Sequence, residues 1–173
     1  MLQIRDATER DAEACAQIYR PYVTDSAISF ELEPPTAEQM AARISSAAAQ
    51  HAWLVLEDAE RVVGFAYGQA FRERAAYRFT CETSIYLETG RRRTGGGHAL
   101  YEALLARLVE RGYRLAVAGM TLPNEASVAL HRALGFEPVG VYRGVGWKHG
   151  RWHDVAWMQK TITPDDRPVV EPR

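Results

Sequence analysis

The sequence of 173 residues lacks most of the features that mark specialised classes of protein. Its two cysteines, Cys15 and Cys81, lie far apart and outside any CxxC motif, which favours reduced thiols over a disulfide. No apolar run approaches the roughly 18 residues that a membrane-spanning helix needs. Residues 1–11 are charged from residue 5 onward and lack the apolar core of a signal peptide. We therefore expect a cytoplasmic protein without a membrane segment.

Neither sign of charge dominates the chain. The 21 lysines and arginines nearly balance the 22 aspartates and glutamates, which gives a formal net charge of -1. This balance argues against a dedicated binder of nucleic acid or of anionic membranes, because such proteins carry an excess of positive charge. Repeats and linkers are also missing. We expect one domain over residues 1–163, followed by a flexible, proline-rich tail over residues 164–173.

The order of strand-like and helix-like segments predicts a mixed α+β fold. A strand, a glycine-rich loop, a helix and another strand follow one another over residues 81–119, which indicates a βαβ crossover and one parallel strand pair. A short extended segment is expected at residues 26–35. The expected strands are residues 2–7, 53–58, 61–71, 80–87, 114–122, 136–150 and 151–162, and the expected helices are residues 8–23, 38–50, from the glycines to 111, and 125–134.

Residues 91–105, RRRTGGGHALYEALL, place three arginines and three glycines at the entrance of a predicted helix. Consecutive glycines cost stability there, so their presence needs a reason. The first N–H groups of a helix attract anions, and glycines let a phosphate approach the backbone closely. Either this loop binds a phosphate group, which the arginines favour, or it is only a flexible connection.

Two common nucleotide-binding motifs do not fit this loop. The pattern GxxxxGK[ST] is absent, and a leucine stands where the dinucleotide pattern GxGxxG needs its third glycine. Arg92-x-x-Gly95-x-Gly97 instead resembles the pyrophosphate loop, [QR]xxGx[GA], of the GNAT superfamily of acetyl-CoA-dependent N-acetyltransferases. The segment at 124–136 resembles a second signature of that family, with His131 where most members carry tyrosine.

The resemblance to one branch of the family, the phosphinothricin and methionine sulfoximine N-acetyltransferases, rests on four ordered blocks: SFELEPPT, CETSIYL, LPNEASVALHRALGF and GWKHGRWHDVAWMQ. It covers residues 2–162. It implies the GNAT fold, which is a mixed, mostly antiparallel central sheet with a splayed parallel strand pair and flanking helices. It also implies acetyl-CoA as co-substrate without a metal, a small amino acid as acceptor, and a homodimer.

Acetyl transfer to an amine needs a base that removes a proton from the nitrogen. Glu82 adjoins an apolar strand, where alternation places it on one side with Ser84 and Tyr86. By spacing alone Glu82 is either a base in a poorly hydrated cleft or a solvated charge, and the resemblance implies the base. His131 would by itself be a core or surface histidine, and the resemblance implies a role near the sulfur or in proton relay.

The resemblance further implies which residues hold acetyl-CoA. The backbone at 85–87 would pair with the pantetheine arm as an added strand would, and the glycine loop would hold the pyrophosphate. Asn124 would bind the pantetheine arm, although asparagine is also among the best N-cap residues. The implied residues are Ile85, Tyr86, Leu87, Arg93, Thr94, Gly95, Gly96, Gly97, His98 and Asn124.

Arginines and aromatic residues crowd the segment at 71–79, FRERAAYRF. Guanidinium groups bind carboxylates in bidentate fashion, so this segment either recognises the carboxylate of an amino acid or is a solvated loop. In the resembling branch the part at 72–74 faces the substrate. Phe30 and Glu31 would wall the other side, unless they are core and surface residues. The candidate substrate-binding residues are Phe30, Glu31, Arg72, Glu73, Arg74 and Arg78.

Two other functions stay open beside transfer to a small amino acid. A GNAT enzyme acting on protein N-termini or lysines would need an open acidic groove, against which the arginine-rich segment argues. A non-catalytic acyl-CoA-binding module would not need Glu82. His149 and His153 fall on a predicted hairpin rather than a helix, so we expect no metal site there. The tryptophans of this hairpin are packing or dimer-interface residues.

Overall fold

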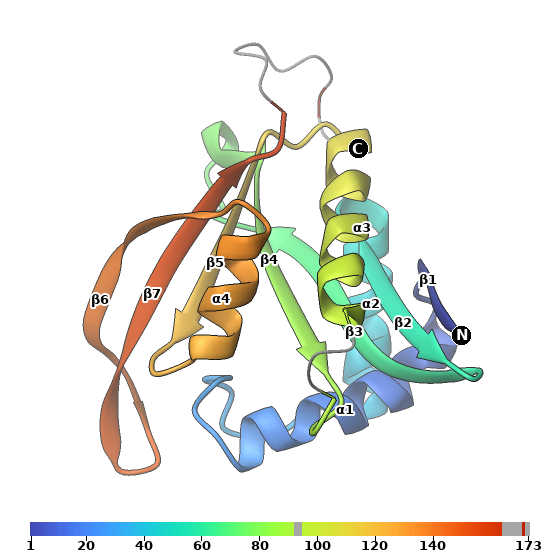
Figure 1. Cartoon of the computed structure of the whole chain (residues 1–173), viewed down its shortest axis with the longest axis horizontal. Coiled ribbons are helices and arrows are strands. Elements are labelled where there is room, and N and C mark those ends of the chain that lie inside the picture. Colours follow the sequence, from blue (N-terminus) through green and yellow to red (C-terminus); the bar gives the residue numbers. More distant parts are fainter. Residues whose placement is uncertain (92–94, 164–170, 172–173) are drawn as a thin grey trace.

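The computed structural model describes residues 1–91, 95–163 and 171, which form a seven-stranded sheet with helices on both faces (Figure 1). The strand order is β1-β2-β3-β4-β5-β7-β6. Apart from Glu171, the predicted tail lies outside the described residues. The strands are β1 (Leu2–Asp6), β2 (Trp53–Asp58), β3 (Arg61–Ala70), β4 (Thr80–Leu87), β5 (Leu115–Thr121), β6 (Glu137–Lys148) and β7 (Arg151–Thr161), and the helices are α1 (Ala12–Thr24), α2 (Ala37–Gln50), α3 (Gly96–Glu110) and α4 (Glu125–Ala133).

The N-terminal half follows the sequence pattern closely. The Thr36 hydroxyl accepts the N–H of Gln39, whose side chain accepts the N–H of Thr36, and this reciprocal cap starts α2. Strands β2 and β3 are joined by Ala59 and Glu60, whose φ values of 49° and 63° match the left-handed turn that suits a twisted hairpin. The segment at 26–35, predicted to be extended, belongs to the loop between α1 and α2 and pairs with no described strand.

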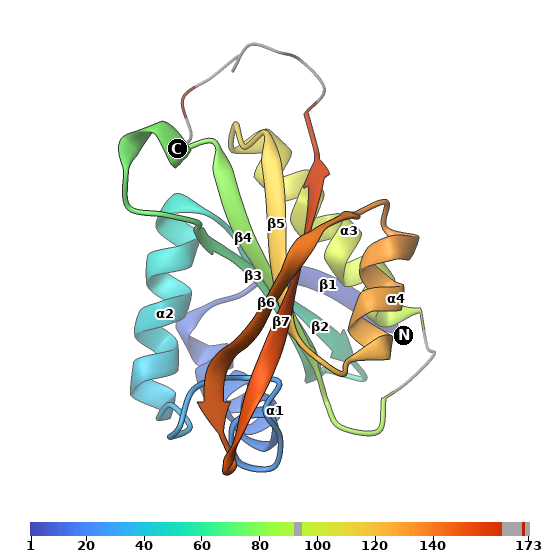
Figure 2. The same cartoon turned by 90° about the vertical axis from the view of Figure 1, so that its left-hand side faces the viewer.

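Strands β4 and β5 form the parallel pair that the crossover predicts. Register pairs join them only from Thr80–Leu115 to Glu82–Val117. Beyond Glu82 the two strands diverge, so that the sheet is split in its middle (Figure 1). Helices α1 and α2 cover one face of the sheet, and α3 and α4 cover the other (Figure 2). The split therefore begins at Glu82, with α1 and α2 on one face of the sheet and α3 and α4 on the other.

The C-terminal hairpin of β6 and β7 turns at His149 and Gly150, as the sequence predicts. β7 pairs with β5, which leaves β6 at the edge of the sheet. The register shifts between Tyr142 and Gly146, where the carboxylate of Asp154 accepts the N–H of Gly144 at 2.7 Å. The tip of the hairpin reaches past the sheet toward the end of α1 (Figure 2).

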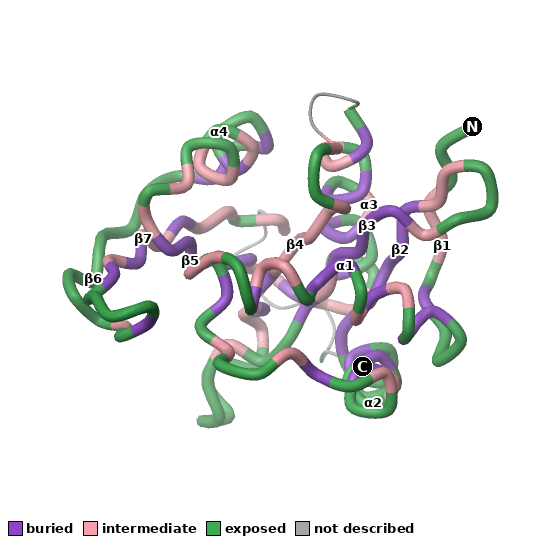
Figure 3. Tube along the Cα trace, turned by 90° about the horizontal axis from the view of Figure 1, so that it is seen from below, coloured by how far each residue is buried: buried purple, intermediate pink, exposed green. Residues whose placement is uncertain are grey.

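Apolar side chains are buried on both faces of the sheet, whereas β6 is exposed along most of its length (Figure 3). Both cysteines are buried free thiols, as expected. None of the helices in the described ranges is both long enough and apolar enough to cross a membrane. The α1–α2 side of the core contains Val23, Met40, Ile44, Trp53 and Phe65, and the α3–α4 side contains Leu100, Leu104, Leu108, Ala116 and Met158.

Candidate active site

A cleft of about 1080 Å³ opens on the α1–α2 face, beside the start of the split. Its walls come from the loop after α1, from α2, from strands β2 to β5, and from the C-terminal hairpin. Polar and aromatic side chains both line it, as expected of a site for a small polar ligand. They include Tyr19, Phe30, Glu31, Arg43, His51, Tyr67, Gln69, Glu82, Ser84, Tyr86, Tyr142, Val145 and Trp157.

Glu82 lies in the floor of this cleft. Strand alternation turns Glu82, Ser84 and Tyr86 into the cleft and buries Cys81 and Thr83 on the other side, as the sequence predicts. Burial raises the pKa of the Glu82 carboxyl above its ordinary value. A hydrogen bond from Gln69 and the charge of Arg72 act in the opposite direction. A carboxylate with a raised pKa is a stronger base, so Glu82 is suited to accept a proton.

Phe30 and Glu31 also line the cleft, and their role in substrate binding stays a prediction. Arg43 donates to both carboxylate oxygens of Glu31, at 2.6 and 3.0 Å, and the Tyr19 hydroxyl donates to one of them at 3.0 Å. The hydrogen bonds from Arg43 hold the pKa of Glu31 below its usual range, so Glu31 is ionised at neutral pH. Arg43 itself was not among the predicted site residues.

The arginine-rich segment at 71–78 is placed differently. Arg72, Glu73, Arg74 and Arg78 are exposed and do not form the walls of the cleft. Arg72 lies over the ring of Phe71, at 4.5 Å, and is close enough to Glu82 for its charge to lower the pKa of that carboxyl. Arg78 instead makes a bidentate ion pair with Glu171, at 2.7 and 2.9 Å. Their role in substrate binding stays a prediction.

The glycine loop leads into α3 on the opposite face of the sheet. Gly95 is the N-cap of α3, with φ of 74°, and a Cβ there would point into open space. Glycine is favoured at that angle, and the space it leaves is available to an anion at the helix N-terminus. Glycine is favoured at position 97 for a different reason: an added Cβ would lie 3.0 Å from the side chain of Leu87. Arg93 and Thr94, two further predicted residues, lie outside the described ranges.

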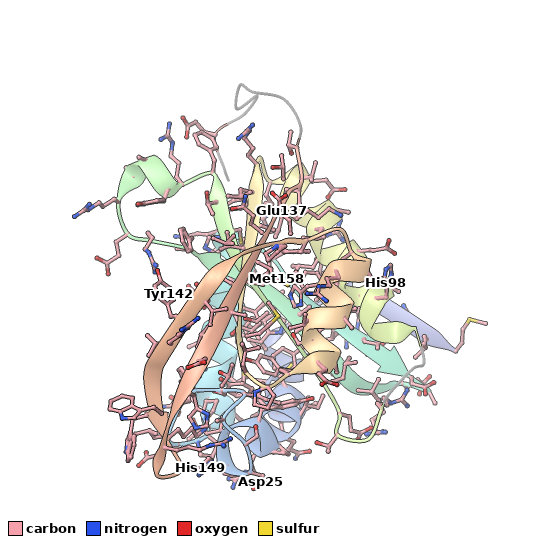
Figure 4. The ribbon with its side chains drawn as sticks, turned by 60° about the vertical axis from the view of Figure 1, so that its left-hand side comes forward. Asp25, His98, Glu137, Tyr142, His149 and Met158 are labelled. Carbon is pink, nitrogen blue, oxygen red and sulfur yellow. The ribbon has the colours of Figure 1, made fainter. Side chains whose placement is uncertain are left out.

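Gly96 and His98 complete the predicted loop. Gly96 is the first residue of α3 and is buried. His98 is labelled in Figure 4 at the start of α3, where its Nδ1 lies 3.3 Å from the Glu102 carboxylate. The backbone N–H groups at this helix end are thus among the groups that the described part of the loop offers to an anion.

The backbone of β4 presents polar groups to the split. The N–H of Glu88 donates to the carbonyl of Val63 at 2.8 Å, which fixes the alternation of the β3–β4 ladder. By that alternation the backbone groups of Ile85 and Leu87 point away from β3, toward the gap. The Tyr22 hydroxyl donates to the Leu87 carbonyl at 2.6 Å. Tyr86, the third predicted residue of this strand, pairs with β3 and contributes its side chain to the cleft.

His131 is buried on the α3–α4 face and does not line the cleft. Its Nδ1 lies 2.7 Å from the carbonyl of Ser127, and its Nε2 lies 2.9 Å from the hydroxyl of Tyr101. That hydroxyl lies 2.7 Å from the hydroxyl of Thr83, which neighbours Glu82 but faces the other side of β4. Burial lowers the pKa of His131 below its ordinary value, so the ring is neutral at pH 7.

Tyr101 and Thr83 were not predicted as site residues, although the alternation of β4 already placed Thr83 on the side away from Glu82. Asn124 is the N-cap of α4, because its side chain accepts the N–H of Ser127 at 3.2 Å. Its predicted contact with a cofactor stays a prediction. Among the described residues, no group of three or more His, Cys, Asp or Glu is placed to hold a metal ion.

Comparison with known sequences fits this geometry. The acetyltransferase (GNAT) domain family matches residues 4–157 of the chain. The protein belongs to the GNAT family. The split between β4 and β5 and the glycine-capped α3 are thus features of a GNAT fold, as the sequence predicted. Family membership also identifies the protein as an acetyltransferase.

Two curated relatives cover nearly all of this GNAT chain. It is 36% identical over 170 residues to the phosphinothricin N-acetyltransferase of Streptomyces viridochromogenes, covering 97% of this chain and 93% of that one. It is 34% identical over 163 residues to the L-methionine sulfoximine/L-methionine sulfone acetyltransferase of Pseudomonas paraeruginosa, covering 93% and 95%. The predicted branch of the family is therefore confirmed.

A solved structure supports the same assignment. The fold matches the crystal structure of a GNAT superfamily phosphinothricin acetyltransferase from Sinorhizobium meliloti in complex with AcCoA, with a TM-score of 0.91. The two chains are 38% identical, and the match covers 99% of this chain and 93% of that one. The predicted α+β architecture, with a mostly antiparallel sheet and one parallel pair, is confirmed in full.

Proposed function

We propose that the protein transfers acetyl from acetyl-CoA to the α-amine of a small amino acid such as phosphinothricin or methionine sulfoximine. The observation that carries this proposal is the position of Glu82. It lies at the last register pair before β4 and β5 diverge, with its side chain in the cleft. An acyl group that enters through the gap from the α3 side therefore meets a carboxylate of raised pKa and an acceptor cleft at one point.

The glycine-capped end of α3 supports the binding of acetyl-CoA. The N–H groups of Gly96, Gly97 and His98 would hold the pyrophosphate together with Arg93, Thr94 and Gly95. The outward backbone groups of Ile85 and Leu87 would hydrogen-bond the pantetheine arm, as an added strand does, and Tyr86 would position the strand from the cleft side. Asn124, the N-cap of α4, would bind the same arm while it shares its cap bond.

The reaction is a direct attack without a covalent enzyme intermediate. The α-amine, with an ordinary pKa near ~8, enters as an ammonium group and gives one proton to the Glu82 carboxylate. The neutral nitrogen attacks the thioester carbonyl carbon, and a new C–N bond forms. As the C–S bond breaks, the nitrogen gives up a second proton, which passes to the departing thiolate and leaves coenzyme A as the free thiol.

His131 is the residue that we propose for proton handling on the thiolate side. Both of its ring nitrogens have protein partners, Ser127 and Tyr101, so it acts on the thiolate only by exchanging one of these bonds. Tyr101 and Thr83 extend the chain from Nε2, and their hydroxyl groups both donate and accept, so they would rearrange when His131 exchanges a bond. A direct contact between His131 and the cleft is not required.

The acceptor's two charged ends need opposite partners. Its ammonium group is proposed to face Glu82, and Glu31, paired with Arg43, lies on another wall together with the apolar surface of Phe30. Its carboxylate is proposed to face Arg72, whose charge already acts on Glu82, with Arg74 and Arg78 extending the positive field and Glu73 limiting it. Binding of the acceptor would draw the segment at 72–78 toward the cleft.

Two copies of the chain are proposed to associate through β6. This strand ends the sheet order, so one row of its backbone groups pairs with no strand in the part of the chain that the structure describes. A row of exposed apolar side chains follows it, as is typical of protein interaction surfaces. Sedimentation near twice 19.4 kDa supports the dimer, and a species of that single mass contradicts it. The exposed side chains are Val139, Val141, Tyr142, Val145 and Trp147, with Trp152 on β7.

The proposed function is tested by acetyl-CoA consumption with three kinds of acceptor: free amino acids, their sulfoximine or phosphinic analogues, and short peptides. Turnover with free amino acids or analogues supports the proposal. Turnover confined to peptides supports an enzyme that acts on protein termini or lysines. No turnover with any amine, combined with tight binding of acetyl-CoA, supports a non-catalytic module. The buried free cysteines Cys15 and Cys81 favour a reducing compartment, and we propose the cytoplasm.

A further inference from the structure

Gly146, on β6, lies directly against the ring of Phe30. A Cβ built on Gly146 would fall 2.2, 2.3 and 2.9 Å from three carbons of that ring. Real Cβ atoms do not approach other atoms so closely, so the ring and any side chain at 146 exclude each other. The backbone angle does not explain this glycine, since Gly146 is not among the described positive-φ residues. Space for Phe30 is therefore what requires glycine at this position.

The loop that carries Phe30 is fixed to the same hairpin. The ammonium group of Lys148 donates to the carbonyls of Val23, Ser29 and Glu31, at 2.6, 2.7 and 2.9 Å. Only 4% of Lys148 is exposed, and all three of its N–H donors are used. The loop backbone therefore cannot withdraw as a unit to make room for a larger residue at 146.

A second contact fixes the start of this loop. The ring of His149, at the tip of the hairpin, lies 3.2 Å from the carbonyl of Ser26. Figure 4 shows His149 beside Asp25, where α1 has just ended. Because the loop is held at both sides of Phe30, a group added at 146 would displace the ring rather than the backbone. The ring of Phe30 lines the cleft, so its displacement changes the space for an acceptor.

We infer that Gly146 determines acceptor specificity by setting the depth to which the Phe30 ring withdraws from the cleft. The inference rests on the proposed function, because it requires the acceptor to bind in this cleft. The hairpin supports the loop in two ways: Gly146 leaves space for the Phe30 ring, and Lys148 holds the backbone on either side of Phe30. A side chain at 146 would push the ring toward the acceptor and exclude the larger amino acids first.

The test compares Gly146→Ala with Gly140→Ala, on the same strand, where an added Cβ meets nothing within 4 Å. Gly146→Ala is expected to lower kcat/KM for a long acceptor, methionine sulfoximine, by about tenfold or more relative to a short one, alanine. The KM for acetyl-CoA should not change. Gly140→Ala should change neither acceptor by more than about twofold. Equal effects of the two substitutions overturn the inference.

Removal of the Phe30 ring should rescue the defect of Gly146→Ala. Phe30→Ala alone should favour long acceptors over short ones, and Phe30→Ala with Gly146→Ala should behave like Phe30→Ala. If the double variant still has the low kcat/KM of Gly146→Ala for long acceptors, the inference is wrong, and an active wild type leaves the proposed function standing. If the wild type acetylates neither free amino acids nor their sulfoximine or phosphinic analogues, the proposed function fails. In every case a crystal structure of Gly146→Ala with the ring of Phe30 unmoved overturns the inference.

Discussion

The hydroxyl of Tyr101 lies 2.9 Å from Nε2 of His131, in the buried space between α3 and α4. The hydroxyl of Thr83 continues the chain at 2.7 Å, and it also lies 3.2 Å from the carbonyl of Val117. With neutral His131, Thr83 donates to Tyr101 and Tyr101 donates to Nε2. With a proton on Nε2, all these bonds reverse and Thr83 donates to Val117. Both protonation states of His131 are therefore fully hydrogen-bonded.

Tyr101→Phe should destabilise the protein, because it leaves Nε2 of His131 buried without a donor. The expected loss is about 1–3 kcal/mol in the free energy of unfolding, measured by urea denaturation at pH 7. The effect of Tyr101→Phe on kcat distinguishes a proton-transfer role of His131 from a packing role. If protons pass through Tyr101, then Tyr101→Phe and His131→Gln should lower kcat by similar factors. If His131 only packs, kcat should survive Tyr101→Phe.

The pH dependence of stability should report His131 as well. Burial lowers its pKa in the folded chain, whereas the unfolded chain titrates near ~6.5. Between these two values the unfolded state binds more protons, so stability falls as the pH drops below about 6.5. His131→Gln should flatten this slope. Burial also lowers the pKa of His51, so part of the pH dependence should remain in the variant. If His131→Gln leaves the slope unchanged, His131 is not a source of this pH dependence.

Glu82→Gln should separate activity from stability. Loss of the base is expected to lower kcat/KM by roughly 10²–10⁴-fold, most strongly below pH 8, where the amine is protonated. The raised pKa of Glu82 means that its ionised form opposes folding, and this cost grows as the pH rises through the folded pKa. The variant should therefore be as stable as the wild type at pH 7, or more so. Loss of both activity and stability would point to a structural role.

The sequence predicts the sheet and the floor of the site because both depend on local patterns. Alternation alone places Glu82, Ser84 and Tyr86 in the cleft. It does not predict Arg43 or Lys148, because their partners are the carboxylate and carbonyls of a loop whose path depends on the whole fold. The contact of Phe30 with Gly146 joins positions more than 100 residues apart, and no period in the sequence encodes it.

Gly95→Ala should weaken binding of acetyl-CoA, and Gly150→Ala provides a matched control. The two glycines have φ values of 74° and 73°, and an added Cβ meets nothing within 4 Å at either position. Both substitutions should cost about 1–2 kcal/mol of stability, because both force alanine into the left-handed region. Only Gly95→Ala should raise the Kd for acetyl-CoA, by about tenfold in calorimetric titration. Equal Kd values for the two variants would refute the phosphate cradle.

Lys148→Met should destabilise the protein more than Lys160→Met. Lys148 is buried and donates to two loop carbonyls and to one at the end of α1, whereas the ammonium group of Lys160 is half-buried and donates to the carbonyl of Leu134. Loss of the first set leaves carbonyls of the α1–α2 loop without a donor, at an expected cost of about 3 kcal/mol, against about 1 kcal/mol for the second. Urea denaturation measures both. Because the loop carries Phe30 and Glu31, Lys148→Met should also raise the KM for the amino acid while the KM for acetyl-CoA stays the same. A change in the acetyl-CoA KM alone would contradict the division of the site into two faces.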